Sequence, residues 1–215
     1  YSRQYIDSKD IKAVTNVLKS DFLTSGPEVN KFENKINKFC KNKYSVAVNS
    51  ATSALHIACK AIGLKKNDYV WTSSISFVAS ANCAFYCGGK IDFVDIDEST
   101  FNISISKLKK KLEVAKKNNK LPKILIPVHL GGLSSNMKEI FDLSKKYNFK
   151  IIEDASHAVG GKYKGTIIGS CKFSNVTIFS FHPVKSITTG EGGMALTNDI
   201  KIYLKMKLLR EHGIE

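Results

Sequence analysis

Short apolar runs alternate with segments of helical periodicity along most of the chain. The apolar runs are rich in β-branched, aliphatic and aromatic residues, which is typical of buried strands; they lie at 44–48, 69–72, 90–94, 123–127, 150–153, 176–180 and 194–197. Helical patterns separate the earlier runs, at 51–62, 77–87, 106–117 and 137–147. This alternation predicts an α/β fold, with a mostly parallel seven-stranded sheet and helices on both faces.

Two further helices are predicted before the first strand. Asp7 or Ser8 can cap the first, and Pro27 suits the first turn of the second. In both, apolar residues recur at the spacing of one helix face: Ile11, Val14 and Leu18 in the first, and Phe32, Ile36 and Phe39 in the second. We expect the second set to form a buried stripe.

The composition fits one large globular domain. With 215 residues, of which 43% are hydrophobic and 24% charged, the chain can bury a substantial core. No stretch has the length of a membrane-spanning helix, and no signal peptide pattern is present, so we expect a cytoplasmic protein that does not bind a membrane. The five cysteines form no Cys-x-x-Cys pair, and Cys83 and Cys87 lie one helical turn apart in an apolar segment. This favours buried free thiols and no metal site.

The formal net charge of +14 has two interpretations. Clustered lysines and arginines can neutralise the phosphates of a nucleic acid. Here the lysines are spread along the chain, and no nucleic-acid recognition motif is present. We therefore favour a generally basic surface with no nucleic-acid partner. Such a surface can attract an anionic substrate such as a sugar nucleotide.

The segment 176–193 carries the strongest candidate for chemistry. Its strand, 176–180, is followed by Lys185 on a polar, glycine-rich turn. Partial desolvation beside an apolar strand lowers the pKa of a lysine and makes its neutral amine available as a nucleophile toward a carbonyl. This suggests covalent attachment of an aldehyde cofactor, pyridoxal 5'-phosphate. Such a site also needs an acid for the ring nitrogen, a phosphate cradle and a flat surface against the ring.

The ends of the predicted strands supply candidates for these parts, because ligands of parallel sheets bind beyond the carboxyl ends of the strands. Asp154 follows a strand and can either hold the ring nitrogen or cap the next turn, with His157 near the other ring substituents. Phe77 follows another strand and can either stack on the ring or fill the core. Thr52, at the start of a helix, and Ser180, at the end of a strand, can bind the phosphate, although helix capping is an equally simple role for Thr52.

Six blocks of the sequence resemble a known family: FLTSGPEV at 22–29, NSATSAL at 49–55, SISFVASAN at 74–82, IIEDASHAVG at 151–160, FSFHPVKSITTGEGG at 179–193 and LLREHGI at 208–214. The family is that of the pyridoxal-phosphate-dependent nucleotide-sugar aminotransferases of the DegT and StrS type. Within it, the chain most resembles enzymes that act on UDP-linked 4-keto-6-deoxy-N-acetylhexosamines, as in the pseudaminic acid pathway. The resemblance implies the large domain of the type I, aspartate-aminotransferase-like fold.

The resemblance also implies a role for each candidate residue. Lys185 forms the Schiff base with the cofactor, Asp154 holds the pyridine nitrogen, and Phe77 stacks on the ring. The other positions match the phosphate site and the ring hydroxyl: Ala51, Thr52 and Ser180 for the phosphate, and His157 for the hydroxyl. Members that remove a hydroxyl group carry histidine in place of the lysine, so the presence of Lys185 favours transamination.

The implied reaction has two halves, in which glutamate gives its amino group to the cofactor and the cofactor then aminates a keto sugar, with Lys185 moving the proton. Family members are longer and form homodimers. We therefore expect residues 1–215 to be the large domain without the smaller C-terminal domain, with weak cofactor binding and poor turnover. Two alternatives stay open: another lysine-dependent pyridoxal enzyme, such as a desulfurase or an amino-acid transaminase, and a non-catalytic relative with a regulatory or basic binding role.

Overall fold

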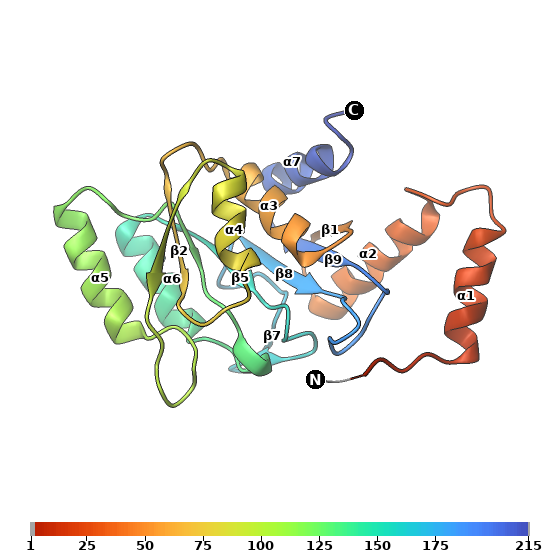
Figure 1. Cartoon of the computed structure of the whole chain (residues 1–215), viewed down its shortest axis with the longest axis horizontal. Helices are drawn as coiled ribbons and strands as arrows, with labels where there is room; N and C mark the ends of the chain where they lie inside the picture. Colours follow the sequence, from red (N-terminus) through yellow and green to blue (C-terminus); the bar gives the residue numbers. More distant parts are fainter. Residues whose placement is uncertain (1–2, 215) are drawn as a thin grey trace.

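A seven-stranded sheet forms the centre of the molecule in the computed structural model, which describes residues 3–214 (Figure 1). The strand order is β1-β9-β8-β5-β4-β2-β3. The strands are β1 (Tyr44–Val48), β2 (Tyr69–Ser73), β3 (Lys90–Val94), β4 (Ile124–Ile126), β5 (Lys150–Asp154), β8 (Val176–Ser180) and β9 (Gly193–Thr197). A separate two-stranded hairpin consists of β6 (Lys162–Tyr163) and β7 (Thr166–Ile167).

Most neighbouring strands run parallel, as the sequence predicts. The pairs β2 with β3, β2 with β4, β4 with β5 and β5 with β8 are parallel, and only β9 is antiparallel to its neighbours β8 and β1. Six strands therefore end at the same edge of the sheet. The reversal from β8 into β9 carries the loop with Lys185 across this edge.

Helices cover both faces of the sheet (Figure 1). The helices are α1 (Ser8–Leu18), α2 (Pro27–Cys40), α3 (Ala51–Ile62), α4 (Ala79–Tyr86), α5 (Ile105–Lys117), α6 (Met137–Tyr147) and α7 (Ile200–Arg210), with a short 3-10 turn, η1 (Leu130–Gly132). Ile152 of β5 packs in the core under α3, α4 and α7, whereas Ile151 packs in the core under α5 and α6. Adjacent residues of a strand point to opposite faces, so this division follows from the pleat. No helix within residues 3–214 is long and apolar enough to span a membrane.

The first two helices form where they are predicted, but their apolar residues are less buried than the pattern indicates. The face of α1 with Ile11, Val14 and Leu18 is exposed, and α1 lies apart from the sheet (Figure 1). In α2 the predicted buried stripe is partly wrong, because Phe39 is 50% exposed. Ile36 and Cys40 are buried, since residues four apart share a helix face and this face, not that of Phe39, meets the sheet.

The prediction of buried free thiols is confirmed, since all five cysteines are free and buried. Other boundaries shift by one or two residues. The helix predicted from residue 77 begins at Ala79, so Phe77 lies in the loop before α4. Strand β5 extends one residue further than predicted and ends at Asp154, whereas β4 is shorter, covering only Ile124–Ile126.

Candidate active site

A cavity of about 470 Å³ opens at the edge of the sheet where the parallel strands end. Its walls come from the first turn of α3, the loop before α4, the ends of β5 and β8, and the loop between β8 and β9. The seven residues singled out from the sequence all line it: Ala51, Thr52, Phe77, Asp154, His157, Ser180 and Lys185. The structure thus brings together residues that are up to 134 positions apart, from 51 to 185.

Lys185 is half-buried in the loop between β8 and β9. Burial lowers the pKa of its amine, and the negative charge of Asp154 offsets this only in part. Within residues 3–214 its Nζ has no hydrogen-bond or ion-pair partner, so nothing but the nearby carboxylate favours the charged form. The expected partial desolvation of this lysine is confirmed, and it increases the fraction of neutral, nucleophilic amine at neutral pH.

Asp154 is the last residue of β5 and is 4% exposed. Its Oδ2 accepts a hydrogen bond of 2.6 Å from the hydroxyl of Ser80, and its Oδ1 accepts one of 2.6 Å from the hydroxyl of Ser156. The main-chain N–H of Ser156 also donates to Oδ1, at 3.2 Å. These donors hold the carboxylate in one orientation at the wall of the cavity.

Ser80 is a site residue that the sequence did not reveal. It lies in the second position of α4, is fully buried, and itself accepts a hydrogen bond of 2.7 Å from the hydroxyl of Ser76. Buried serines are usually satisfied by the helix backbone, so its spacing in the sequence carries no signal. Only the fold places it against Asp154, 74 residues further along the chain.

His157 lies at the rim of the same cavity and is exposed. Partial desolvation lowers the pKa of its imidazole, the positive charge of Lys185 lowers it further, and Asp154 acts in the opposite direction. The main-chain N–H of Gly131 donates to its Nδ1 at 3.3 Å. Since Nδ1 is an acceptor, the neutral ring carries its proton on Nε2.

Phe77 is 69% exposed beside the cavity, before the first turn of α4. The alternative that its ring fills the core is therefore wrong. An exposed aromatic ring at a cavity wall is available to stack on a flat ligand. Stacking on a cofactor ring stays a prediction.

The first turn of α3 forms another part of the cavity wall. Ser50 caps the helix, because its hydroxyl accepts from the N–H of Ser53 at 3.1 Å. The N–H groups of Ala51 and Thr52 belong to the first turn, where a helix offers them no carbonyl partner. Together with the helix dipole, such N–H groups form an anion-binding site. Ser180, at the end of β8, lines the cavity beside them.

Gly193 permits this arrangement. A Cβ at this position would lie within 3.0 Å of three main-chain atoms of Ser50 and Ala51, a separation that Cβ atoms essentially never show. Strand β9 thus passes directly against the first turn of α3. The last glycine of the Gly-Glu-Gly-Gly segment is needed for this close approach, because a side chain would push the anion-binding turn away.

Nearly the whole chain matches one family of enzymes. Residues 4–215 match the DegT/DnrJ/EryC1/StrS aminotransferase family. The chain belongs to this family. The resemblance seen in the sequence motifs is thereby confirmed.

Individual relatives agree in sequence and in fold. The UDP-4-amino-4,6-dideoxy-N-acetyl-beta-L-altrosamine transaminase of Campylobacter jejuni (serotype O:23/36, strain 81-176) is 45% identical over 214 residues, which cover 100% of this chain and 55% of that protein. Helicobacter pylori PseC, an aminotransferase involved in the biosynthesis of pseudoaminic acid, matches with a TM-score of 0.92 and 34% identity, over 100% of this chain and 56% of PseC. NtdA from Bacillus subtilis, solved with bound cofactor PMP, matches with a TM-score of 0.81 and 27% identity, over 94% of this chain and 45% of NtdA.

These likenesses confirm the expected α/β fold, with a mostly parallel sheet flanked by helices, as that of the pyridoxal-phosphate-dependent aminotransferases. The chain spans about half the length of the relatives it matches.

Proposed function

We propose that residues 1–215 are the cofactor-binding large domain of a pyridoxal-phosphate-dependent enzyme. This enzyme transfers an amino group from glutamate to a nucleotide-linked 4-keto-6-deoxy sugar. The reaction belongs to the biosynthesis of cell-surface polysaccharides or glycans. The observation that carries this proposal is the pairing of Lys185 and Asp154 in one cavity. The lysine has a lowered pKa, and the carboxylate is buried and held by two serines. The family membership and the relatives named above support the same reaction.

The residues of the cavity fit the parts of pyridoxal phosphate. Lys185 would bind the aldehyde carbon, Asp154 the ring nitrogen, and Phe77 would lie against the ring. The phosphate would accept hydrogen bonds from the N–H groups of Ala51 and Thr52 and from the hydroxyl of Ser180. His157 would lie near the ring hydroxyl, as the family resemblance implies. When bound, this cofactor supplies an electron-withdrawing ring that stabilises negative charge at the Cα of an amino acid.

The chain's own groups would then move the protons. Once the amino group of the donor has replaced it on the aldehyde carbon, the freed neutral amine of Lys185 would take the proton from the Cα of the donor, a role that its lowered pKa favours. The negative charge of Asp154 would favour the protonated form of the ring nitrogen, and Ser80 and Ser156 hold its two oxygens in place for this contact. The ring of Phe77, in the wall of the cavity, would exclude water from one side of the reacting atoms.

The keto sugar is the acceptor that the relatives favour. The C. jejuni relative is named as a transaminase of a UDP-linked amino sugar. The net charge of +14 also assists the approach of a nucleotide diphosphate. As parts of the same proposal, the working enzyme is a homodimer in the cytoplasm.

Single-turnover chemistry tests this proposal. We expect the chain, loaded with pyridoxal phosphate, to convert glutamate to 2-oxoglutarate in an amount equal to the bound cofactor, and then to aminate a UDP-linked 4-keto-6-deoxy-N-acetylhexosamine. Both products are measured by mass spectrometry, and the Lys185→Met variant is the control. Release of alanine from cysteine instead would favour the desulfurase alternative. Cofactor that binds at Lys185 but converts no amino donor would contradict the proposal.

A further inference from the structure

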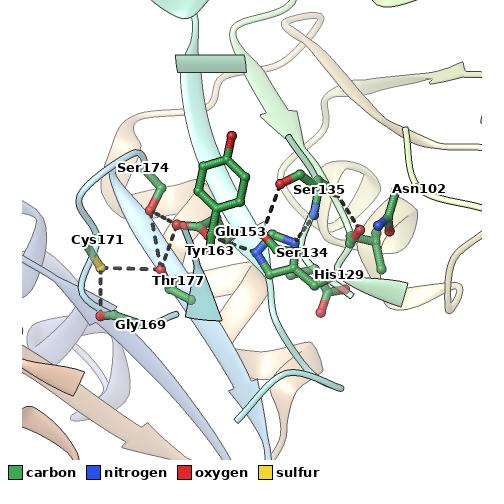
Figure 2. Close-up of polar contacts among 12 residues, drawn as sticks. Asn102, His129, Ser134, Ser135, Glu153, Tyr163, Gly169, Cys171, Ser174 and Thr177 are labelled. Atoms are coloured by element: carbon green, nitrogen blue, oxygen red, sulfur yellow. Dashed lines mark hydrogen bonds and ion pairs between the residues drawn. The ribbon is translucent and has the colours of Figure 1, made fainter. Parts of the chain in front are cut away.

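Two buried residues meet behind the sheet, on the face opposite the cavity. Glu153 precedes Asp154 in β5, so its side chain points to the other face. Its Oε2 lies 2.9 Å from Nε2 of His129, which belongs to the segment that follows β4 (Figure 2). His129 is fully buried and Glu153 is 5% exposed. The pair lines no part of the cavity.

The surrounding hydrogen bonds define the state of the His129 ring. The main-chain N–H of Ser135 donates to Nδ1 at 3.2 Å, so Nδ1 has no proton. The ring is therefore neutral, with its proton on Nε2, and it donates to Glu153. The other oxygen of Glu153, Oε1, accepts from the hydroxyls of Ser174 and Thr177 (Figure 2). Every polar atom of the pair thus has a partner.

His129 also binds the end of β5 through its main chain. Its N–H donates to the carbonyl of Asp154 at 3.0 Å, and the N–H of Asp154 donates to the carbonyl of Pro127 at 2.9 Å. The side chain of His129 therefore contacts Glu153, and its main chain contacts Asp154. A movement of His129 would move the strand end that carries the carboxylate of the cavity.

The turn after His129 contacts His157, which lines the cavity. Gly131, in the left-handed conformation with φ of 60°, donates its N–H to Nδ1 of His157 at 3.3 Å. Gly132, with φ of 90°, lies so near that a Cβ there would be 3.1 Å from the carbonyl of His157. The position of this turn thus decides which ring nitrogen of His157 carries the proton.

A second side chain holds the same turn from the other side. Asn102 accepts from the N–H of Leu130 at 3.0 Å and donates to the carbonyl of Leu133 at 2.9 Å. The turn is therefore fixed at both ends by buried side chains, His129 with Glu153 at one end and Asn102 at the other. Neither anchor contacts the cavity.

We propose that His129 and Glu153 are positioning residues for the active site: from the opposite face of the sheet they hold turn 129–132, and this turn fixes the Nε2–H form of His157 and the main chain of Asp154. The effect of these two positioning residues on catalysis rests on the proposed function. The state of the His157 ring is a property of the chain without any cofactor, so it can be measured independently.

The test is a long-range ¹H–¹⁵N spectrum of the chain labelled with ¹⁵N-histidine, recorded without cofactor. The five histidines are few enough to be assigned one by one. We expect His129 and His157 both to show well-separated nitrogen shifts of the neutral Nε2–H form. In Glu153→Leu, the His129 proton loses its acceptor, and the two nitrogen shifts of His157 should move toward the averaged value of a ring that exchanges between its two forms.

Three variants make the test specific. Glu153→Gln keeps an acceptor for His129 and should restore the His157 spectrum. His129→Asn is a smaller change that keeps a polar group near Ser135 but does not reach Glu153, and it should disturb His157 as Glu153→Leu does. Thr72→Val is the matched control, since it removes a buried hydrogen bond of 2.8 Å to the carbonyl of Ile126 without touching the turn.

Three results would overturn the proposal. The first is a folded Glu153→Leu or His129→Asn protein in which His157 keeps the wild-type spectrum. The second is a Thr72→Val protein that shifts the His157 spectrum as much as these variants do. The third is loss of folding in both Glu153→Leu and His129→Asn while Thr72→Val stays folded, because the pair would then be a requirement of the fold and not of the site. Failure of pyridoxal phosphate to bind would affect only the proposed function.

Discussion

Replacing Gly193 by alanine perturbs the anion-binding turn through one added methyl group. The new Cβ would lie within 3.0 Å of Ser50 and Ala51 main-chain atoms, whereas ordinary contact begins at 3.4 Å. The backbone must therefore separate by more than 0.4 Å. Strand β9 cannot easily retreat, because Gly193 pairs with Val48 on one side and with Ser180 on the other.

The cost follows from this geometry. Overpacking a well-packed site by a methyl group costs about 1–3 kcal/mol. Because the obstacles are main-chain atoms and β9 is paired on both sides, we expect Gly193→Ala to lower the free energy of unfolding by about 3 kcal/mol. The displaced turn carries the N–H groups of Ala51 and Thr52. Weakening one or two hydrogen bonds to a charged phosphate, at about 1.5 kcal/mol each, predicts a loss of pyridoxal phosphate affinity of about 10- to 100-fold.

Urea denaturation gives the free energy of unfolding, and an absorbance titration gives the cofactor affinity. Gly192→Ala is the neighbouring control, since the nearest atom to its Cβ is the hydroxyl oxygen of Thr189, a side chain that can rotate away. We expect this control to cost less than about 1 kcal/mol. Should Gly193→Ala prove as stable as the control and bind pyridoxal phosphate as tightly as the wild type, the close approach of β9 to α3 would be refuted.

Three further changes probe the same account. Lys185→Met should raise the free energy of unfolding at pH 7. Folding lowers the pKa of Lys185, so burying the charged amine destabilises the fold below the folded pKa, and this cost disappears as the pH approaches 10.5. Urea curves in which wild type and variant differ equally at all pH values would contradict this. Ser80→Ala should lower pyridoxal phosphate affinity about tenfold by releasing one oxygen of Asp154, and an unchanged titration would count against that contact. Arg210→Met should lower the free energy of unfolding by about 3 kcal/mol, because the carboxylate of buried Glu33 loses the guanidinium whose Nη1 lies 2.6 Å from its Oε1. A decrease of less than about 0.5 kcal/mol, measured by urea denaturation, would refute this.

Much of the fold could be predicted because hydrophobic periodicity depends only on local geometry. The strands of the parallel sheet and most helix positions follow from it, and so does the meeting of the candidate residues, since parallel strands end at one edge. The exposure of Phe39 could not be predicted this way. The pattern shows that α2 has an apolar face, but the angle at which α2 meets the sheet depends on contacts with Phe181, a residue far along the chain.

The supporting contacts of the site are also beyond periodicity. Ser80 and Asp154 are 74 residues apart, and Glu153 of β5 is 24 residues from His129, which lies in the segment after β4. A serine in a helix and a glutamate in a strand are ordinary residues until the fold pairs them. Chemistry that is local, such as Lys185 after a buried strand, is visible in the sequence, whereas positioning that is tertiary is not.

Lys185 is the proposed attachment point for pyridoxal phosphate, and this can be tested directly. We would add the cofactor to the chain, reduce with borohydride, digest and map the labelled peptide by mass spectrometry. We expect a visible absorption band before reduction and the label on Lys185, with no label in Lys185→Met. A label spread over many surface lysines, or equal labelling of the Lys185→Met variant, would contradict it.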